Sequence, residues 1–88
     1  MGYQETFKAL SDKTRREILS LLRKGPMSVG EIGEHFDISG ATLSHHLTIL
    51  RHADLISDSK KGKFIYYELN TTVLDDILVW LKSLKEEA

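Results

Sequence analysis

The sequence predicts a mainly helical protein that carries one small β-hairpin. Apolar side chains recur at helical spacing in five segments, and turn or capping residues separate these segments from one another. Two β-prone runs flank a Lys-Lys-Gly turn in the second half of the chain. Because the chain has 88 residues, 41% of them hydrophobic, and a single proline, we expect one domain that spans residues 1–88.

The composition excludes several functional classes. The chain has no cysteine, which excludes disulfides, thiolate metal sites and thiol nucleophiles. Its first residues do not combine a basic stretch with an apolar run, and no apolar run reaches membrane-spanning length. We therefore expect a cytoplasmic protein without membrane insertion. Neither a glycine-rich phosphate loop nor a coherent acid–base pair is visible, so the sequence does not predict an enzyme.

The first two helices are predicted from apolar spacing and one capping residue. Tyr3, Phe7 and Leu10 share one face of a short helix that ends near Ser11. Asp12 can cap a second helix, because its carboxylate can accept hydrogen bonds from the free backbone N–H groups of the first turn. The core stripe of this second helix consists of Ile18, Leu19 and Leu22.

A third and a fourth helix are predicted after the break at Gly25-Pro26. Ser28 and Glu31 have the spacing of a capping box, in which each side chain satisfies a backbone N–H group of the other residue. Ser39 can cap a fourth helix that runs to about His52. The inward face of this fourth helix carries Leu43, Leu47 and Leu50.

The last third of the chain predicts two strands and one more helix. The strands are Leu55–Ser59 and Lys63–Leu69, and Gly62 supplies the positive φ that a tight hairpin usually requires. Thr71 or Thr72 can cap the final helix.

Residues 29–47 match a helix-turn-helix. The apolar side chains that can lock two helices across a tight turn are Ile32, Phe36, Ile38 and Leu43. Gly33 allows the second helix to approach closely, and Asp37 stands in the turn, where Asp tolerates unusual backbone angles better than most residues. Because a hairpin with three lysines follows directly, the predicted fold is a winged helix-turn-helix: four helices, a two-stranded wing and a last helix.

The outer face of the fourth helix is the candidate surface for reading DNA bases. On a helical wheel, Leu47 and Leu50 lie within about 40° of Leu43, and the polar side chains lie on the opposite side. These side chains are small or hydrogen-bonding, and residues 40–52 include no acidic residue, which favours close approach in the major groove. The predicted base-contacting residues are Gly40, Ala41, Thr42, Ser44, His45 and Thr48.

Local charge favours DNA binding although the net charge is −1. Residues 39–67 hold four basic and two acidic side chains, whereas residues 70–88 hold two basic and four acidic ones. The predicted phosphate-contacting residues are Ser39, Arg51, Lys60, Lys61 and Lys63. His46 lies about 60° from the apolar centre of its helix. Like His35 and His52, it is interpreted as a packing or turn-bonding histidine.

The last helix displays two adjacent apolar stripes, which is more apolar width than packing on one small domain needs. We expect residues 1–10 and 71–86 to be dimerisation helices of a two-fold interface, which would place two recognition helices about one DNA turn apart. The predicted interface residues are Tyr3, Phe7, Leu10, Val73, Leu74, Ile77, Leu78, Trp80, Leu81 and Leu84. Intramolecular packing of one stripe is the alternative.

Three strings of residues resemble the ArsR/SmtB family of bacterial winged-helix repressors. They run from Phe7 to Leu19, including Ser11-Asp12-Lys13-Thr14-Arg15-Arg16, from Ser39 to Arg51, including Ser44-His45-His46-Leu47, and from Lys61 to Leu69. The resemblance extends over essentially the whole chain. The wing and tail from Gly62 to Trp80 look most like the SdpR-type autorepressor branch of this family.

The resemblance implies a homodimer that binds an inverted-repeat operator, represses its own operon and releases DNA on a signal. By position, Gly40, Ala41, Ser44 and His45 align with the base-reading residues of the family. The metal sites of relatives are not matched, because the corresponding stretch Met27–Ile32 has no cysteine and no histidine occurs from residue 70 onward. We therefore expect a metal-independent repressor without a cofactor, associated with the bacterial nucleoid.

Two alternatives remain open. One is a winged-helix module that binds protein, which the net charge of −1 favours. The other is a metal-sensing repressor with an atypical site of oxygen and histidine ligands. An anti-repressor protein or a small-molecule inducer would leave no readable motif, and the sequence does not define the operator, the regulated genes or the affinity. Whether His46 and Arg51 touch DNA also stays open.

Overall fold

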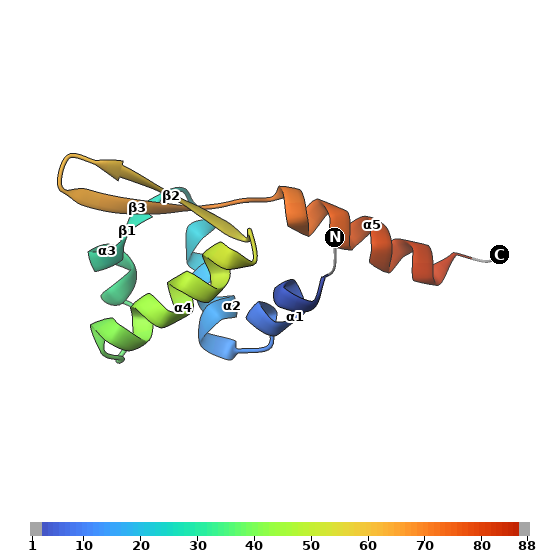
Figure 1. Ribbon diagram of the computed structural model, residues 1–88, viewed down its shortest axis with the longest axis horizontal. Helices are drawn as coiled ribbons and strands as arrows, with labels where there is room; N and C mark the ends of the chain where they lie inside the picture. The colour runs from blue at the N-terminus through green and yellow to red at the C-terminus, as the bar shows by residue number, and fades with distance from the viewer. Residues whose placement is uncertain (1–2, 87–88) are drawn as a thin grey trace.

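The computed structural model describes residues 3–86 and has the predicted mainly helical architecture with a small antiparallel sheet (Figure 1). The helices are α1 (Gln4–Leu10), α2 (Lys13–Leu22), α3 (Val29–Gly33), α4 (Gly40–His52) and α5 (Thr72–Lys85). The strands are β1 (Met27–Ser28), β2 (Ile56–Lys61) and β3 (Phe64–Leu69). The hairpin of β2 and β3 projects at one end of the molecule and α5 at the other, which gives extents of 52 × 24 × 22 Å.

Side-chain caps begin three helices where the sequence predicts them. Before α2, Asp12 Oδ2 accepts a hydrogen bond of 3.1 Å from the backbone N–H three residues later. At α3, Ser28 and Glu31 form the complete capping box, with bonds of 3.2 and 2.9 Å. At α4, Ser39 Oγ accepts from the backbone N–H of Thr42 at 3.1 Å. Each cap satisfies N–H groups that the first turn of a helix leaves free.

The cap predicted for the last helix is wrong. Thr71 precedes α5, but its side chain makes no capping bond. Its backbone lies at φ −88° and ψ −7°, whereas a capping residue is normally extended. Asn70 instead provides the acceptor, because its Oδ1 receives a hydrogen bond of 3.2 Å from the backbone N–H of Thr72.

The cap at Asp12 makes stability depend on pH. The backbone N–H of Arg15 donates to the Asp12 carboxylate and holds its pKa below the ordinary 3.8, outweighing the opposing effect of burial. A carboxyl with a lowered pKa stabilises the fold above its unfolded pKa, and the contribution is lost as pH falls through the folded pKa. We expect Asp12→Asn, which keeps a capping oxygen but does not titrate, to lose less stability than the wild type between about pH 5 and pH 2.

Urea unfolding at a series of pH values tests this expectation. Asp12→Ala serves as the comparison, because it removes the cap and costs about 1 kcal/mol at neutral pH. Equally steep acid destabilisation in the wild type and in Asp12→Asn would contradict the assignment.

The sheet has three strands, whereas the sequence predicts two. In the hairpin, Lys61 lies opposite Phe64, and the turn between them contains Gly62 at a φ of 63°, as predicted. The additional strand β1 pairs with the other edge of β3 and places Met27 opposite Tyr67. A two-residue strand has no alternation pattern, so only the tertiary pairing defines it.

The core lies where α2, α3 and α4 meet the base of the hairpin. The predicted inward stripe of α4 is buried, together with apolar side chains of every neighbouring element. The buried core residues are Ala9, Ile18, Leu22, Ile32, Leu43, Leu47, Leu50, Ala53, Leu55, Ile56, Val73 and Ile77. Helix α5 contributes through Val73 and Ile77, each 5% exposed, and extends beyond this core.

The unusual backbone angle lies at Asp54 and not in the helix-turn-helix turn. Within residues 3–86, Asp54 is the non-glycine residue with a positive φ, 57°. Its N–H donates to the Arg51 carbonyl at 3.0 Å, and the N–H of Leu55 donates to the carbonyl five residues earlier at 3.1 Å. This pair of bonds is a Schellman motif, which ends α4 and turns the chain into the wing. Asp37, in the turn between α3 and α4, does not have a positive φ.

Candidate nucleic-acid interface

Helix α4 is the second helix of the helix-turn-helix and is held by its inner face. Leu43, Leu47 and Leu50 are buried against the core, so the opposite side of the helix is left facing solvent. A Cβ atom built on Gly33 would lie 3.4 Å from Leu43 Cδ2, which is ordinary contact. The close approach of α3 and α4 therefore does not require glycine at this position, contrary to the prediction.

The six residues predicted to contact bases are all exposed on α4. At the start of the helix, Ser39 Oγ also donates a hydrogen bond of 2.9 Å to Thr42 Oγ1. The hydroxyl proton of Ser39 is thus used within the cap, whereas that of Thr42 is left available for an external acceptor. This end of α4 also carries the positive end of the helix dipole, which favours an anionic ligand.

The wing presents its cations to solvent. Lys60 and Lys61 lie on β2, Lys63 lies in the turn, and all three side chains are exposed. Lys61 Nζ lies 5.9 Å from the ring centroid of Tyr66, within the range of a weak cation–π contact. The wing extends from the α3 and α4 side of the molecule, away from α5 (Figure 1). All three cations thus lie at or beside the turn of the wing, which projects at the opposite end of the molecule from α5.

We expect the wing lysines to contribute to the salt dependence of DNA affinity. Changing Lys60, Lys61 and Lys63 to Gln should flatten the dependence of log K on log salt concentration by about one unit for each phosphate that the variant no longer binds. Preference between DNA sequences should change little, because phosphate contacts carry no direct sequence information. Anisotropy titrations at several salt concentrations measure both quantities. Changing Lys82 and Lys85 of α5 to Gln is the matched control, and equal slopes for the two variants would contradict the prediction.

Arg51 lies where α4 meets the base of the wing. The pKa of the neighbouring Tyr67 phenol is raised, first by burial and then by the Asp58 carboxylate, while the Arg51 charge opposes the rise. Arg51 itself is exposed in the last turn of α4. Its guanidinium is therefore free to face a ligand that contacts both α4 and the wing.

Of the histidines that are interpreted from the sequence as packing residues, only His46 packs against neighbouring side chains. His46 is half-buried, and its Nδ1 lies 3.2 Å from Arg15 Nη1 and 3.9 Å from Asp12 Oδ2, in agreement with the packing interpretation. His35 and His52 are exposed, so the same interpretation is wrong for them. Both lie near the end of a helix, where the chain is already leaving the core.

Arg15 is a structural residue that sequence reasoning missed. Its side chain is 8% exposed although it lies in a charged stretch of α2. Nε donates to the Ala9 carbonyl at 2.8 Å, and Nη2 donates to the Lys8 carbonyl at 3.0 Å. Helical spacing predicts only an amphipathic surface here, since an arginine is rarely buried unless its donors are paired. Its partners lie on other elements and are not visible in the local sequence.

The predicted dimerisation helices leave an apolar surface uncovered. Tyr3, Phe7 and Trp80 form an aromatic cluster that joins α1 to α5, with ring centroids 5.8–6.3 Å apart. Phe7 and Trp80 of this cluster are exposed, and so are the other apolar side chains Leu78, Val79, Leu81 and Leu84 of α5. Val73 and Ile77 are occupied in the core of the protomer, so they offer little surface to a partner. Tyr3, Leu10 and Leu74 are half-buried.

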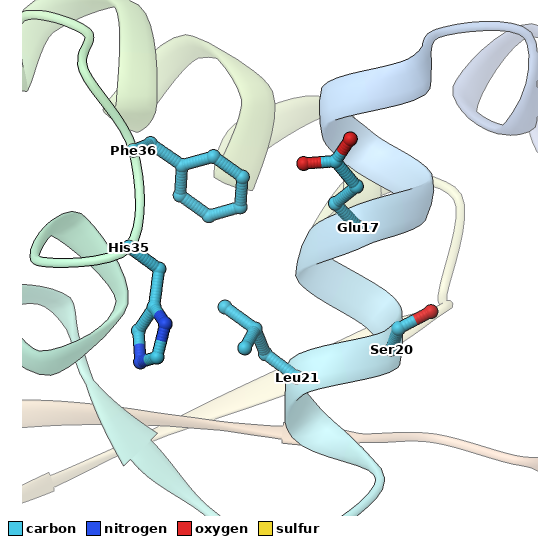
Figure 2. Close-up of a pocket in the computed structure, with 5 residues that line it drawn as sticks. All are labelled: Glu17, Ser20, Leu21, His35 and Phe36. Atoms are coloured by element: carbon cyan, nitrogen blue, oxygen red, sulfur yellow. The ribbon is translucent and has the colours of Figure 1, made fainter.

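An open hollow is lined by residues that are not among those predicted to contact DNA (Figure 2). Glu17, Ser20 and Leu21 of α2 line one side, and His35 and Phe36 after α3 line the other. Among residues 3–86, no group of three or more His, Cys, Asp or Glu side chains is placed to hold a metal ion. Within the same residues, no helix has the length and apolar character needed to cross a membrane.

The fold and the surface together define a class of protein. An exposed helix without acidic residues follows the turn of a helix-turn-helix, and a basic hairpin follows that helix. This arrangement is that of a winged-helix DNA-binding regulator, in which the second helix enters the major groove.

Comparison with known proteins agrees with this class. The sequence model of the family "Bacterial regulatory protein, arsR family" matches residues 12–58. Transcriptional repressor SdpR of Bacillus subtilis (strain 168) is 60% identical over 75 residues, which cover 85% of this chain and 83% of SdpR. An arsenical resistance operon repressor of Staphylococcus aureus is 42% identical over 81 residues, which cover 89% of this chain and 78% of that protein.

Solved structures give the same result. An ArsR-like transcriptional regulator from Rhodococcus sp. RHA1 matches with a TM-score of 0.89 at 28% identity, over 94% of this chain and 76% of that one. The chain therefore belongs to the ArsR family, and it is a winged-helix transcriptional repressor homologous to SdpR and not an enzyme.

Proposed function

We propose that the protein represses transcription as a homodimer that binds an inverted-repeat operator in its own promoter, without a metal or other cofactor. The outer face of α4 carries this proposal. It is exposed, it has no acidic side chain, and the basic wing follows it directly. A helix face that is exposed to solvent and binds no ligand more often carries Glu and Lys residues. Glu residues on such a face would repel DNA phosphates.

Base reading is assigned to the first three turns of α4. His45 can donate a hydrogen bond to guanine, and Ser44 and Thr48 can bond a base or a phosphate. Ala41 and the methyl group of Thr42 can contact a thymine methyl, and the absence of a side chain at Gly40 lets the helix end approach the groove closely.

Phosphate binding is assigned to residues on both sides of this reading surface. Ser39 lies at the start of α4, Arg51 lies near its end, and the wing lysines lie beside it. Contacts from several sides fix the register of a protein on the duplex. The proposal therefore explains why cations gather in residues 39–67 although the whole chain has a net charge of −1.

Dimerisation is assigned to α1 and α5. We assign the exposed side chains of Phe7, Leu78, Trp80, Leu81 and Leu84 to this interface. A two-fold axis would pair this surface with itself and separate two copies of α4 by about one turn of DNA, which matches an inverted repeat. Small domains gain much of their stability from such burial. The domain then spans residues 1–88, and residues 1–10 and 71–86 are assigned to dimerisation; residues 1, 2, 87 and 88 lie outside the described part of the chain.

Metal independence is supported by the ligands that the sequence offers. The chain has no cysteine, and its four histidines lie at positions 35, 45, 46 and 52, with none on α5. Adjacent histidines on a helix point about 100° apart, so His45 and His46 make a poor pair of ligands. Release of DNA is accordingly assigned to an anti-repressor protein or a small-molecule inducer. The repressor acts in the bacterial cytoplasm, at the nucleoid.

The net charge of −1 favours one competing function, a winged-helix module that binds protein. Such a module would show no salt-dependent affinity for DNA.

The test is an anisotropy titration of a fluorescent duplex taken from immediately upstream of the protein's own gene, with a scrambled duplex as control. The proposal predicts a preference of about 10³-fold or more that weakens with salt and survives a chelator. Loss of binding on chelation would contradict metal independence. Equal, weak binding to both duplexes would contradict autorepression and favour the interaction module.

A further inference from the structure

Arg15 connects three helices through one guanidinium group. Two of its nitrogens donate to carbonyls in the last turn of α1, those of Lys8 and Ala9, at 3.0 and 2.8 Å. The third, Nη1, lies 3.2 Å from Nδ1 of His46 on α4. The Lys8 carbonyl also accepts hydrogen bonds from the backbone N–H and the Oγ of Ser11, at 3.3 and 2.6 Å. Arg15 therefore adds bonds from α2 to the end of α1, which has few intrahelical donors of its own.

The contact with His46 has a defined direction. A guanidinium group has five N–H donors and no acceptor, so Arg15 donates and Nδ1 of His46 accepts. Nδ1 of His46 also lies 3.9 Å from Asp12 Oδ2, so this side of the imidazole faces both the Arg15 guanidinium and the Asp12 carboxylate. The imidazole that neighbours the reading residues Ser44 and His45 is thus fixed by a buried charge from α2.

One part of the junction between α1 and α4 is open, although Ala9 of α1 is buried in the same core as the inner face of α4. Glu5 and Lys8 of α1 face Ile49 and His52 of α4 across an open hollow. Beside this hollow, Arg15 makes the polar connection between the last turn of α1 and His46 of α4. Helix α1 in turn contacts Trp80 of α5 through Phe7.

We propose that Arg15 and His46 are positioning residues that set the orientation of α4 relative to the dimerisation helix α1, and thereby the preference of the protein for its operator. The inference rests on the proposed DNA-binding function. In a two-fold dimer, both recognition helices must enter successive major grooves at the same time. A change in the angle between α1 and α4 would therefore displace α4 from the groove at both half-sites. Neither residue needs to touch DNA to have this effect.

Two substitutions at residue 46 place a hydrogen-bond acceptor at different distances from the backbone, and so test the role of Nδ1. In His46→Asn, Oδ1 is attached to Cγ and takes the place of Nδ1, whereas in His46→Gln the oxygen is one bond farther, near the place of Nε2. Arg15→Lys keeps a positive charge but has no planar fork with which to bond two carbonyls and an imidazole together. His52→Gln, on the same helix and exposed, is the matched control.

The readouts are the ratio of affinities for the operator duplex and a scrambled duplex, the salt slope, the sedimentation of the dimer and the thermal unfolding midpoint. We expect His46→Gln and Arg15→Lys each to lower the ratio about tenfold or more, and His46→Asn and His52→Gln to stay within about threefold of the wild type. The salt slope should not change in any of them, because each variant keeps all the side chains assigned to phosphate binding. The double variant Arg15→Lys/His46→Gln should be little worse than either single variant, because both changes break the same contact.

Several results would overturn the inference. An unchanged ratio in His46→Gln, or equal losses in His46→Asn and His46→Gln, would exclude the role of Nδ1. A shallower salt slope in the His46 variants would mean direct phosphate contact. If Arg15→Lys does not fold, the pair of His46 variants decides alone, and if the wild type shows no preference, the proposed function fails together with this inference.

Discussion

Changing both Ser44 and His45 to alanine is expected to remove most of the preference for the operator while the dimer stays folded. Both side chains are exposed on the outer face of α4, so their removal should change stability by no more than about 0.5 kcal/mol. A good base contact contributes about 1–3 kcal/mol of discrimination. Loss of two should lower the preference for the operator by about 30-fold or more.

The matched control for this variant uses the same residue types elsewhere. Ser20 and His35 are also exposed, but they line the open hollow of Figure 2. Changing both to alanine should leave the ratio of operator to scrambled affinity unchanged. Anisotropy gives the ratio and circular dichroism gives the unfolding midpoint. A Ser44→Ala/His45→Ala variant that retained its specificity would refute the assignment of α4 as the reading helix.

A single glutamate in the predicted dimer surface is expected to separate the protomers. Leu84 is 64% exposed in the protomer, so Leu84→Glu should barely affect the fold of one copy. In a two-fold interface, the same change would bury two carboxylates among apolar side chains, which is strongly unfavourable. Monomers would then bind each half-site separately and lose about 10²-fold or more in operator affinity, because the second half-site no longer binds intramolecularly.

Val79 supplies the control for the dimer prediction. It is 71% exposed on α5, yet at 100° per residue it lies about 140° around the helix from Leu84 and away from the apolar stripes. Val79→Glu should remain dimeric and bind the operator as the wild type does. Sedimentation equilibrium distinguishes the two variants. A dimeric Leu84→Glu variant, or a monomeric Val79→Glu variant, would show that the interface lies elsewhere.

Features that local chemistry controls could be predicted from the sequence. The caps at Asp12, Ser28 and Ser39 depend on residues within three positions of one another, and the structure contains all three. The inward stripe of α4 follows from helical periodicity, and Gly62 follows from the turn that a short hairpin requires. For the same reason, the outer face of α4 could be identified as exposed before any tertiary contact was known.

Features that depend on tertiary contacts could not be predicted in this way. Strand β1 exists because Met27 lies opposite Tyr67, forty residues later in the chain. The burial of Arg15 depends on carbonyls of α1 and on His46 of α4. The division of the apolar face of α5 between the core and an exposed surface likewise requires knowing which part of the helix extends beyond the protomer.

Footprinting of the duplex bound by the intact protein tests the central claim most directly. Two copies of α4 related by a two-fold axis should protect guanines in two major-groove segments whose centres lie about one helical turn, 10–10.5 base pairs, or a multiple of it apart. Ser44→Ala/His45→Ala should remove both protected segments together. A single protected segment, or no protection at a protein concentration that saturates the wild-type anisotropy signal, would contradict the reading of DNA by a dimer through α4.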